Sequence, residues 1–292
     1  MDNKLTLGTV HIVEWLRPGD ARTGWELFDE LEPLGIASRP EVQVKFWRAV
    51  TRDDFLNLLR TFEDEFRASA RTPLLHIETH GNVDGIGVSH DEGINWPDLM
   101  EVLVAFNRLT RLNLVVILAA CEGFWGVQML QLDRRAAAFR GLIGPNRAVR
   151  TREMSDGCMA FYRTLFGQLN GDTALKAVND AVNPAEKTFW IISAETAFKT
   201  VYQGYLDKQC TPEAIEKRVE TIVANIGARL RAEGRPARFN WEIERNRETA
   251  RKHLSDHRAR FEEMRREFFF IDLYPENAER FDFTFEDCQP RP

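Results

Sequence analysis

The sequence predicts an α/β fold: a three-layer α/β/α sandwich with a mostly parallel central sheet, followed by a C-terminal helical hairpin. Two observations predict the sandwich. Short apolar runs, such as those in LLHIETHGN and NLVVILAACEG, suit strands that are covered by helices on both faces. These runs alternate with segments of helical periodicity, and strands separated by helices form right-handed parallel crossovers. A third observation, two apolar stripes of helical spacing near the C-terminus, predicts the hairpin.

The strands of the sandwich are predicted from apolar or alternating runs. They cover residues 5–16, 41–50, 74–80, 113–121, 141–149 and 187–194. The segment GNVDGIGVSHDEG, residues 81–93, is rich in Gly and Asp and predicts a small hairpin after the third strand.

The helices between these strands are predicted from apolar residues that recur every three or four positions. In the second helix Phe55, Leu59 and Phe62 show this spacing, and in the third helix Pro97 stands near the first turn, where proline is tolerated. The predicted helices cover residues 23–35, 52–69, 96–112, 124–138, 153–169 and 172–182.

The last part of the chain changes character, so we predict two domains, residues 1–207 and 208–292. Thr211 and Pro212 suit a helix start, and an apolar stripe continues to Leu230. After the GRPARFN segment a second stripe recurs at spacings of four and three, which is a heptad seam. The seam consists of Ala250, Leu254, His257, Phe261, Met264 and Phe268. A strand-like FFFIDLY segment is expected after the hairpin.

Composition narrows the class of protein. The 292 residues carry a net charge of −6, and the sequence has no long run of basic residues of the kind that binds nucleic acid. No stretch approaches the twenty apolar residues that cross a bilayer, and the N-terminal residues lack a secretion-signal pattern. The four cysteines have no paired spacing, which argues against a disulfide framework or a zinc cluster. We therefore expect a cytoplasmic protein with no metal or cofactor and with neither nucleic acid nor membrane as partner.

Two reactive side chains end two of the buried strands. His80 ends the third predicted strand and Cys121 ends the fourth. Because parallel strands place their carboxyl ends at one edge of a sheet, we expect the imidazole and the thiol to meet there. A thiol beside an imidazole can perform nucleophilic acyl transfer.

This arrangement resembles the clan CD cysteine peptidases, which include the caspases, metacaspases, legumain, gingipains, separase and the bacterial CHAT-type peptidases. The resemblance rests on His80-Gly81 and on Ala120-Cys121, with Gly123 completing a Cys-x-Gly motif. One hairpin and one helix separate the two motifs, as in that family. The resemblance covers about two-thirds of the chain and leaves out the C-terminal hairpin.

The resemblance implies a role for each of these residues. Cys121 would attack a peptide carbonyl and form an acyl-enzyme, and His80 would protonate the leaving amine. The backbone N–H groups of Gly81 and Cys121 would form the oxyanion hole. No cofactor is implied.

Substrate preference is less constrained. Caspases that cut after aspartate carry Gln two positions before the nucleophile, and Ala119 stands there in this chain. Glu78 and Asp84 are candidates to line a pocket for a basic side chain, and Glu122 is a weaker one. For each of the three, an ordinary solvated carboxylate is the competing interpretation.

The leading hypothesis is a caspase-like cysteine endopeptidase that cleaves a protein or peptide substrate; the resemblance implies regulated or defence-linked proteolysis. The alternative is a non-catalytic caspase-like scaffold that binds a regulatory protein through its C-terminal helices. A different thiol acyl transfer on the same dyad, and a metal site made from His76, His80 and Cys121, are weaker alternatives. The heptad seam can close within one chain or between two chains, so a homo-oligomer is compatible with the pattern.

Overall fold

The computed structural model describes residues 7–89, 91–130, 136–168, 170–183, 185–235 and 239–289. They form two compact units. Unit 1 comprises residues 7–130 and 136–194, and unit 2 comprises residues 195–289. The domain boundary expected at 207/208 stays a prediction.

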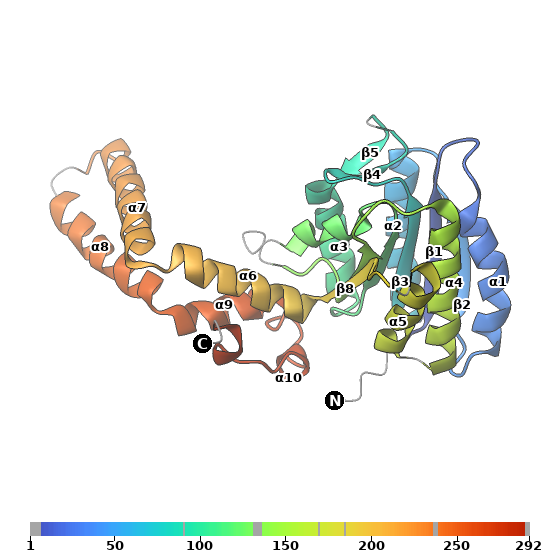
Figure 1. Cartoon of the computed structure of the whole chain (residues 1–292). Helices are drawn as coiled ribbons and strands as arrows, with labels where there is room; N and C mark the ends of the chain where they lie inside the picture. Colours follow the sequence, from blue (N-terminus) through green and yellow to red (C-terminus); the bar gives the residue numbers. More distant parts are fainter. Residues whose placement is uncertain are drawn as a thin grey trace. The chain divides into compact units, whose positions relative to one another are not determined.

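A six-stranded sheet forms the centre of unit 1 (Figure 1). Its strands are β1 (Thr9–Trp15), β2 (Gln43–Arg48), β3 (Pro73–Thr79), β6 (Val115–Ala119), β7 (Gly141–Pro145) and β8 (Phe189–Ser193). The spatial order is β2-β1-β3-β6-β7-β8, with β8 antiparallel to β7 and every other pair parallel. The predicted mostly parallel sheet is confirmed.

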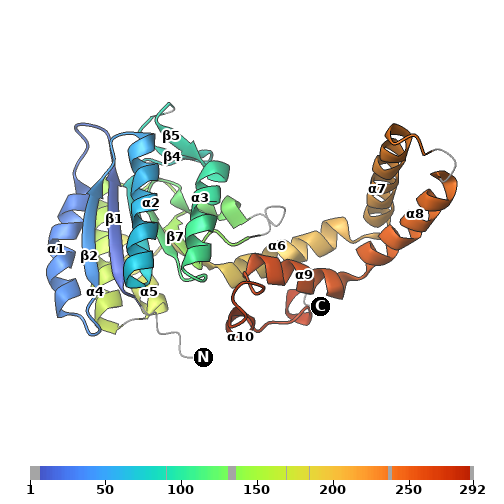
Figure 2. The ribbon, with the colours of Figure 1, turned by 180° about the vertical axis from the view of Figure 1, so that it is seen from behind.

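Helices cover both faces of this sheet (Figures 1 and 2), which confirms the three-layer architecture. One layer contains α1 (Thr23–Ala37), α4 (Thr151–Gln168) and α5 (Gly171–Val182), and the other contains α2 (Arg52–Ser69) and α3 (Trp96–Leu109). Successive side chains of each strand point to opposite faces of the sheet, so they pack against the two helical layers in turn. Val10 and Ile12 of β1 belong to the core cluster that includes Phe161 of α4 and Val178 of α5.

Polar caps fix where the helices of the second layer begin. The Thr51 hydroxyl accepts a hydrogen bond from the Asp54 backbone N–H, and the Asp54 carboxylate accepts one from the Thr51 N–H. This capping box satisfies two donors that would otherwise lack partners in the first turn. Asn95 caps α3 in a similar way, because its side chain accepts from the N–H of Asp98.

The segment after Cys121 differs from the prediction. Instead of an α-helix over 124–138, the structure has a 3₁₀-helix, η1 (Gly123–Leu130), and residues 131–135 lie outside the described part of the chain. Residues 136–140 are not helical. A run of apolar residues does not distinguish an α-helix from the tighter 3₁₀ turn, so the periodicity alone predicted the wrong helix type.

Unit 2 is helical. Its elements are α6 (Ala194–Gln209), α7 (Pro212–Ala232), α8 (Phe239–Ser255), α9 (His257–Phe268), α10 (Asn277–Arg280) and η4 (Glu286–Cys288). The predicted hairpin is confirmed as α7 and α8, which pack side by side around Val219 and Leu254. An ion pair also links the two helices at the surface: the Arg251 guanidinium of α8 binds both carboxylate oxygens of Glu216 of α7, at 2.6 and 2.8 Å.

The heptad seam does not continue through one helix. It is interrupted at Asp256, whose carboxylate caps α9 by accepting from the Ala259 N–H. Leu254, before the break, packs against α7, whereas Phe261, after it, contacts the rings of Phe198 and Tyr202 of α6. The two halves of the seam therefore serve two different contacts within unit 2.

The strand expected at FFFIDLY is wrong. Phe268 ends α9, and Phe270 has a φ of 55°, which an extended strand does not tolerate. The Asn277 side chain donates to the Phe269 carbonyl at 2.9 Å and holds this turn closed. The aromatic residues pack as a cluster rather than as a strand, with Phe269 stacked on Phe281 at 4.5 Å.

Candidate functional site

The sheet brings the two sequence motifs together. β3 and β6 are neighbouring parallel strands, and Glu78 of β3 pairs with Ala119 of β6. His80 follows the last residue of β3 directly, and Cys121 follows β6 by two residues. Both therefore lie at the carboxyl edge of the sheet, which is the edge beside the β4 (Gly85–Gly87) and β5 (Gly93–Asn95) hairpin in Figure 1.

Gly81 makes the closest contact between the two motifs. A Cβ at this position would lie 2.6 Å from the backbone oxygen of Cys121 and 3.0 Å from the Cβ of Ala120. Its N–H makes no backbone hydrogen bond among the described residues, because the flanking groups make the cross-strand bonds: the Gly87 N–H donates to the His80 carbonyl, and the Asn82 N–H to the Gly85 carbonyl. The Cys121 N–H is also without a backbone acceptor in the described chain.

Replacing Gly81 with Ala is expected to lower the free energy of unfolding by about 1–3 kcal/mol, because the new methyl group would overlap a backbone atom that cannot rotate away. Urea unfolding of the variant measures this change. Gly167→Ala is the matched control, since a Cβ there meets nothing within 4 Å and the position is helical. A Gly81→Ala variant as stable as the control would contradict the close contact.

A carboxylate that the sequence did not single out binds His80. Asp20 lies in the loop between β1 and α1, and its Oδ2 is 2.8 Å from Nε2 of His80. The hydrogen bond from His80 and the backbone N–H of Arg17, which donates to the same oxygen at 2.9 Å, help hold the pKa of Asp20 below its usual value. An ionised carboxylate can only accept, so Nε2 carries the proton and Nδ1 is the nitrogen of neutral His80 left free to accept one.

The Cys121 thiol is partly buried. Its Sγ lies 3.8 Å from the carbonyl oxygen of Val149, to which the thiol can donate. The other cysteine of unit 1, Cys158, is fully buried in α4, and burial raises the pKa of its thiol well above the usual value. Cys121 is therefore the more accessible thiol of this unit.

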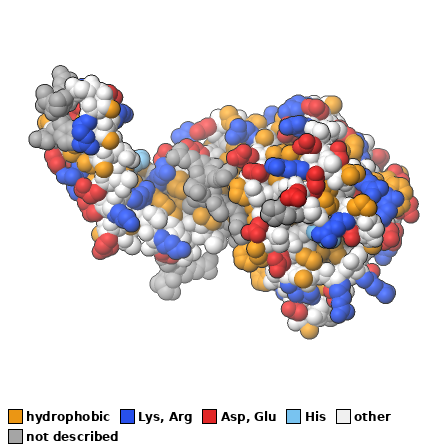
Figure 3. Space-filling model, turned by 90° about the horizontal axis from the view of Figure 1, so that it is seen from above, with side chains coloured by type: hydrophobic (Ala, Val, Ile, Leu, Met, Phe, Trp, Pro, Cys, Tyr) orange, Lys and Arg blue, Asp and Glu red, His pale blue; other side chains and the backbone are white. Residues whose placement is uncertain are grey.

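Two cavities meet at His80 and Cys121, and both residues line both of them. The larger, about 700 Å³, runs along the β4–β5 hairpin and includes Gly81 and Arg17 in its wall. The smaller, about 130 Å³, lies on the other side of the dyad and includes Asp20 and Glu78. Figure 3, which views the molecule from above this edge, shows acidic and basic side chains side by side on the surface.

Three of the four residues expected to shape substrate preference line these cavities. Glu78 and Ala119 are buried, at 3% exposure each, in the wall of the smaller cavity. Asp84 is exposed and lines the larger cavity. Glu122 is not among the described residues that line either one.

Glu122 adopts a left-handed backbone conformation, with a φ of 58°. Its N–H donates to the Arg147 carbonyl at 3.2 Å, and its carbonyl accepts from the Trp125 N–H at 2.9 Å. A non-glycine residue in this region is strained, and such strain is common at functional sites. The turn at Glu122 ends the extended segment after β6 and leads the chain from Cys121 into η1.

A buried hydrogen-bond network lies beneath the smaller cavity. Nε2 of His76 is 3.0 Å from Glu78, and its Nδ1 is 3.1 Å from the Tyr162 hydroxyl. The ligand atoms of His76, Glu78 and Cys158 lie within 4.8 Å of one another, as a metal site would require. Both imidazole nitrogens already have protein partners, so the cluster is explained as a network. Among the described residues no such group includes both His80 and Cys121.

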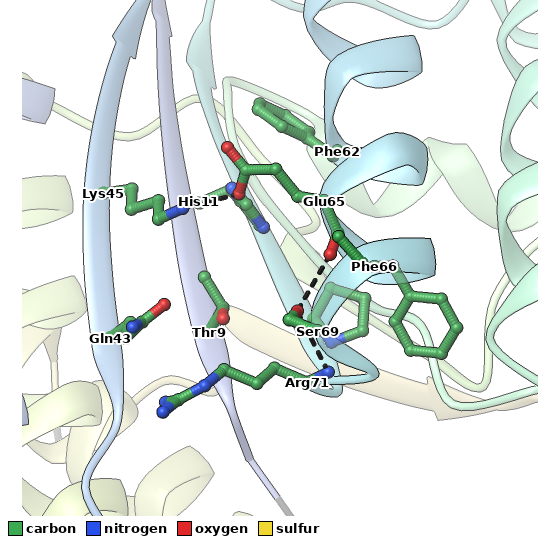
Figure 4. Close-up of a pocket in the computed structure, with 11 residues that line it drawn as sticks. Thr9, His11, Gln43, Lys45, Phe62, Glu65, Phe66, Ser69 and Arg71 are labelled. Atoms are coloured by element: carbon green, nitrogen blue, oxygen red, sulfur yellow. Dashed lines mark hydrogen bonds and ion pairs between the residues drawn. The ribbon is translucent and has the colours of Figure 1, made fainter.

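A separate cavity of about 200 Å³ lies against the first half of β1 and β2 beneath α2 (Figure 4). Lys45 and Glu65 form an ion pair at 2.7 Å in its wall. His11 is 3% exposed and stacks on Phe62 at 4.2 Å; burial, aided by the nearby charge of Lys45, lowers its pKa to about 3. No cysteine is among the described residues of its wall, so this cavity lacks the thiol chemistry available at Cys121.

The solved structures that are similar to this chain include one of a caspase. It is titled "Crystal structure of the Drosophila initiator caspase Dronc"; it is 12% identical, the similarity covers 65% of this chain and 80% of that chain, and the TM-score is 0.47. No protein-family model matches the chain, and no curated protein matches it. No helix of the described chain has the length and apolar character needed to span a bilayer.

Proposed function

We propose that this protein is a cysteine endopeptidase that uses Cys121 as its nucleophile and His80 as its acid and base. One observation carries the proposal. The thiol and the imidazole lie on the walls of the same two cavities at the carboxyl edge of the sheet, and the ring of His80 is oriented by Asp20.

The geometry supports a standard acyl-transfer sequence. The sulfur of Cys121 attacks a peptide carbonyl while Nδ1 of His80 takes up the thiol proton, directly or through a water molecule; the C–N bond then breaks, and the imidazolium passes that proton to the leaving amine. Water then attacks the thioester while His80 accepts its proton; the C–S bond breaks, His80 returns the proton to the sulfur, and the acid product and free thiol are released. Nδ1 is the nitrogen available for these transfers because Nε2 is held by Asp20.

Two backbone donors are available for the oxyanion. The N–H groups of Gly81 and Cys121 have no backbone acceptor among the described residues, and the two residues are in close contact. A preorganised donor of this kind typically contributes about 2.7–4 kcal/mol to the transition state. The absence of a side chain at Gly81 lets a substrate carbonyl approach.

The test is cleavage of a diverse peptide library, with sites determined by mass spectrometry. Cys121→Ala is expected to abolish cleavage, because Cys121 is the one thiol among the described residues that line the two cavities. Cys210→Ala is the control, since that thiol is also partly exposed but lies in unit 2. Cleavage that persists in Cys121→Ala would show that Cys121 is not the nucleophile of the observed activity.

The biological setting is part of the same proposal. The resemblance to clan CD peptidases implies regulated or defence-linked proteolysis of a protein substrate. The composition favours the cytoplasm, and the helices of unit 2 are the candidate binding surface for a regulatory partner. A wild-type protein that cleaves nothing, alone or with cell extract added, would instead favour a caspase-like scaffold.

A further inference from the structure

The smaller cavity beside Cys121 is acidic. Two carboxylate residues, Asp20 and Glu78, line it, and no Lys or Arg is among the described residues of its wall. The remaining lining is largely apolar and includes Leu16, Val149 and Met154. Its volume of about 130 Å³ is far above the roughly 10–15 Å³ that admits a single water molecule. An extended side chain with a charged end fits such a space.

Glu78 differs from its neighbour Glu14 in how its charge is balanced. The two residues are in register on adjacent strands and both are buried. Glu14 forms an ion pair with Arg22 at 3.5 Å and accepts from the Trp25 N–H. No Lys or Arg of the described chain lies within ion-pair distance of Glu78, whose partners are the Thr23 hydroxyl at 2.8 Å and Nε2 of His76 at 3.0 Å.

Glu78 keeps room for a further donor. Each carboxylate oxygen accepts more than one hydrogen bond, and in Glu78 one oxygen faces Thr23 and the other His76. A buried carboxylate whose partners are a hydroxyl and an imidazole, with no Lys or Arg beside it, gains from a further cationic donor that binds next to it. The cavity opens beside Cys121, so the group that brings the cation belongs to a substrate bound at the thiol.

We propose that this cavity accepts the side chain of a Lys or Arg residue immediately before the scissile bond, with Glu78 as its counter-charge. The inference rests on the proposed peptidase function for its meaning in catalysis. The apolar lining contacts the methylene groups, and Glu78 binds the ammonium or guanidinium group. An aspartate side chain would meet two carboxylates and is rejected, and a leucine side chain would cover Glu78 without offering a donor.

The first experiment needs no catalysis. Iodoacetamide alkylates Cys121, and butylguanidinium, which mimics an arginine side chain, is expected to slow this alkylation at least tenfold when it saturates the cavity. Butylurea, which is similar in shape but uncharged, is the matched probe and should protect weakly. Equal protection by both compounds, or by neither, would overturn the assignment of the cavity.

The second experiment measures cleavage of peptides that differ only in the residue before the reporter group: Arg, Lys, Gln, Leu or Asp. Peptides with Arg or Lys are expected to be preferred, and Glu78→Gln should lower kcat/KM for them by about 10- to 100-fold while changing the Gln peptide little. Glu14→Gln is the control, because Glu14 is equally buried but is not in the described wall of the cavity. Thermal unfolding confirms that each variant is folded.

The outcomes separate the two proposals. Cleavage that needs Cys121 but follows Leu or Asp would overturn the basic preference and leave the peptidase function standing. Selective protection of Cys121 by butylguanidinium without cleavage of any peptide would support the cavity assignment and count against the peptidase. Should Glu78→Gln fail to fold, the wild-type peptide series and the protection assay still decide the question.

Discussion

Asp20→Ala should lower kcat/KM for peptide cleavage by about 10²- to 10⁴-fold. The hydrogen bond at 2.8 Å between Asp20 and Nε2 of His80 fixes the tautomer and the orientation of a ring that is otherwise 42% exposed. In Ser-His-Asp hydrolases, removing the acceptor that holds the histidine tautomer costs about 10⁴-fold in kcat. The lower end of the range allows for solvent replacing part of the interaction at this partly exposed pair.

Two variants separate positioning of His80 from a general loss of charge or fold. Asp20→Asn keeps the size and shape of the side chain, but its amide group can donate to Nε2 and favour the wrong tautomer, so it is expected to lose about as much activity as Asp20→Ala. Asp29→Ala removes an exposed carboxylate from α1 and should leave kcat/KM unchanged. Equal activity in Asp20→Ala and the wild type would show that His80 needs no carboxylate partner.

Acid should destabilise the protein through His11. Because burial lowers the pKa of His11 to about 3, the folded protein keeps this imidazole neutral while the unfolded chain binds a proton below about pH 6.5. The contribution of neutral His11 to the free energy of unfolding is therefore fully present above pH 6.5 and is lost as the pH falls toward 3. Between pH 6.5 and 4.5 the expected loss is about 2–3 kcal/mol.

Urea midpoints measured from pH 7 to pH 4 test this expectation. His11→Phe keeps a ring that can stack on Phe62 and should remove most of the dependence, whatever its stability at pH 7. His253→Gln, at an exposed position in α8, is the control and should keep the wild-type slope. A wild-type midpoint that does not move between pH 6.5 and 4.5 would contradict the burial of a neutral His11.

The sheet was predictable because its strands are nearly continuous apolar runs. Such runs have few alternatives to a strand covered on both faces, and the same reasoning placed His80 and Cys121 at one edge. Residues 194–209 were not predicted to be helical. Phe198 and Tyr202 of α6 are buried among other aromatic residues of unit 2, so tertiary packing, rather than a clear local pattern, accounts for much of this helix.

Asp20 illustrates what a local pattern cannot provide. It lies in a polar loop, RPGD, where an aspartate is an ordinary turn residue. Only its position after β1, the strand next to β3, distinguishes it, because loops after parallel strands reach the same edge as His80. That topological signal was present in the sequence, although the side-chain contact itself was not.

The reversed direction of β8 brings the end of the sheet's last strand to the edge where β1 begins. Ser193, the last residue of β8, lies opposite Gly141, the first residue of β7, and Thr9 begins β1 at that same edge. The first strand of unit 1 thus begins, and its last strand ends, at the edge of the sheet away from Cys121. A tag or a fused domain joined before Thr9 or after Ser193 therefore starts at the edge of the sheet opposite the dyad, which favours residue 194 as the cut when unit 1 is expressed alone.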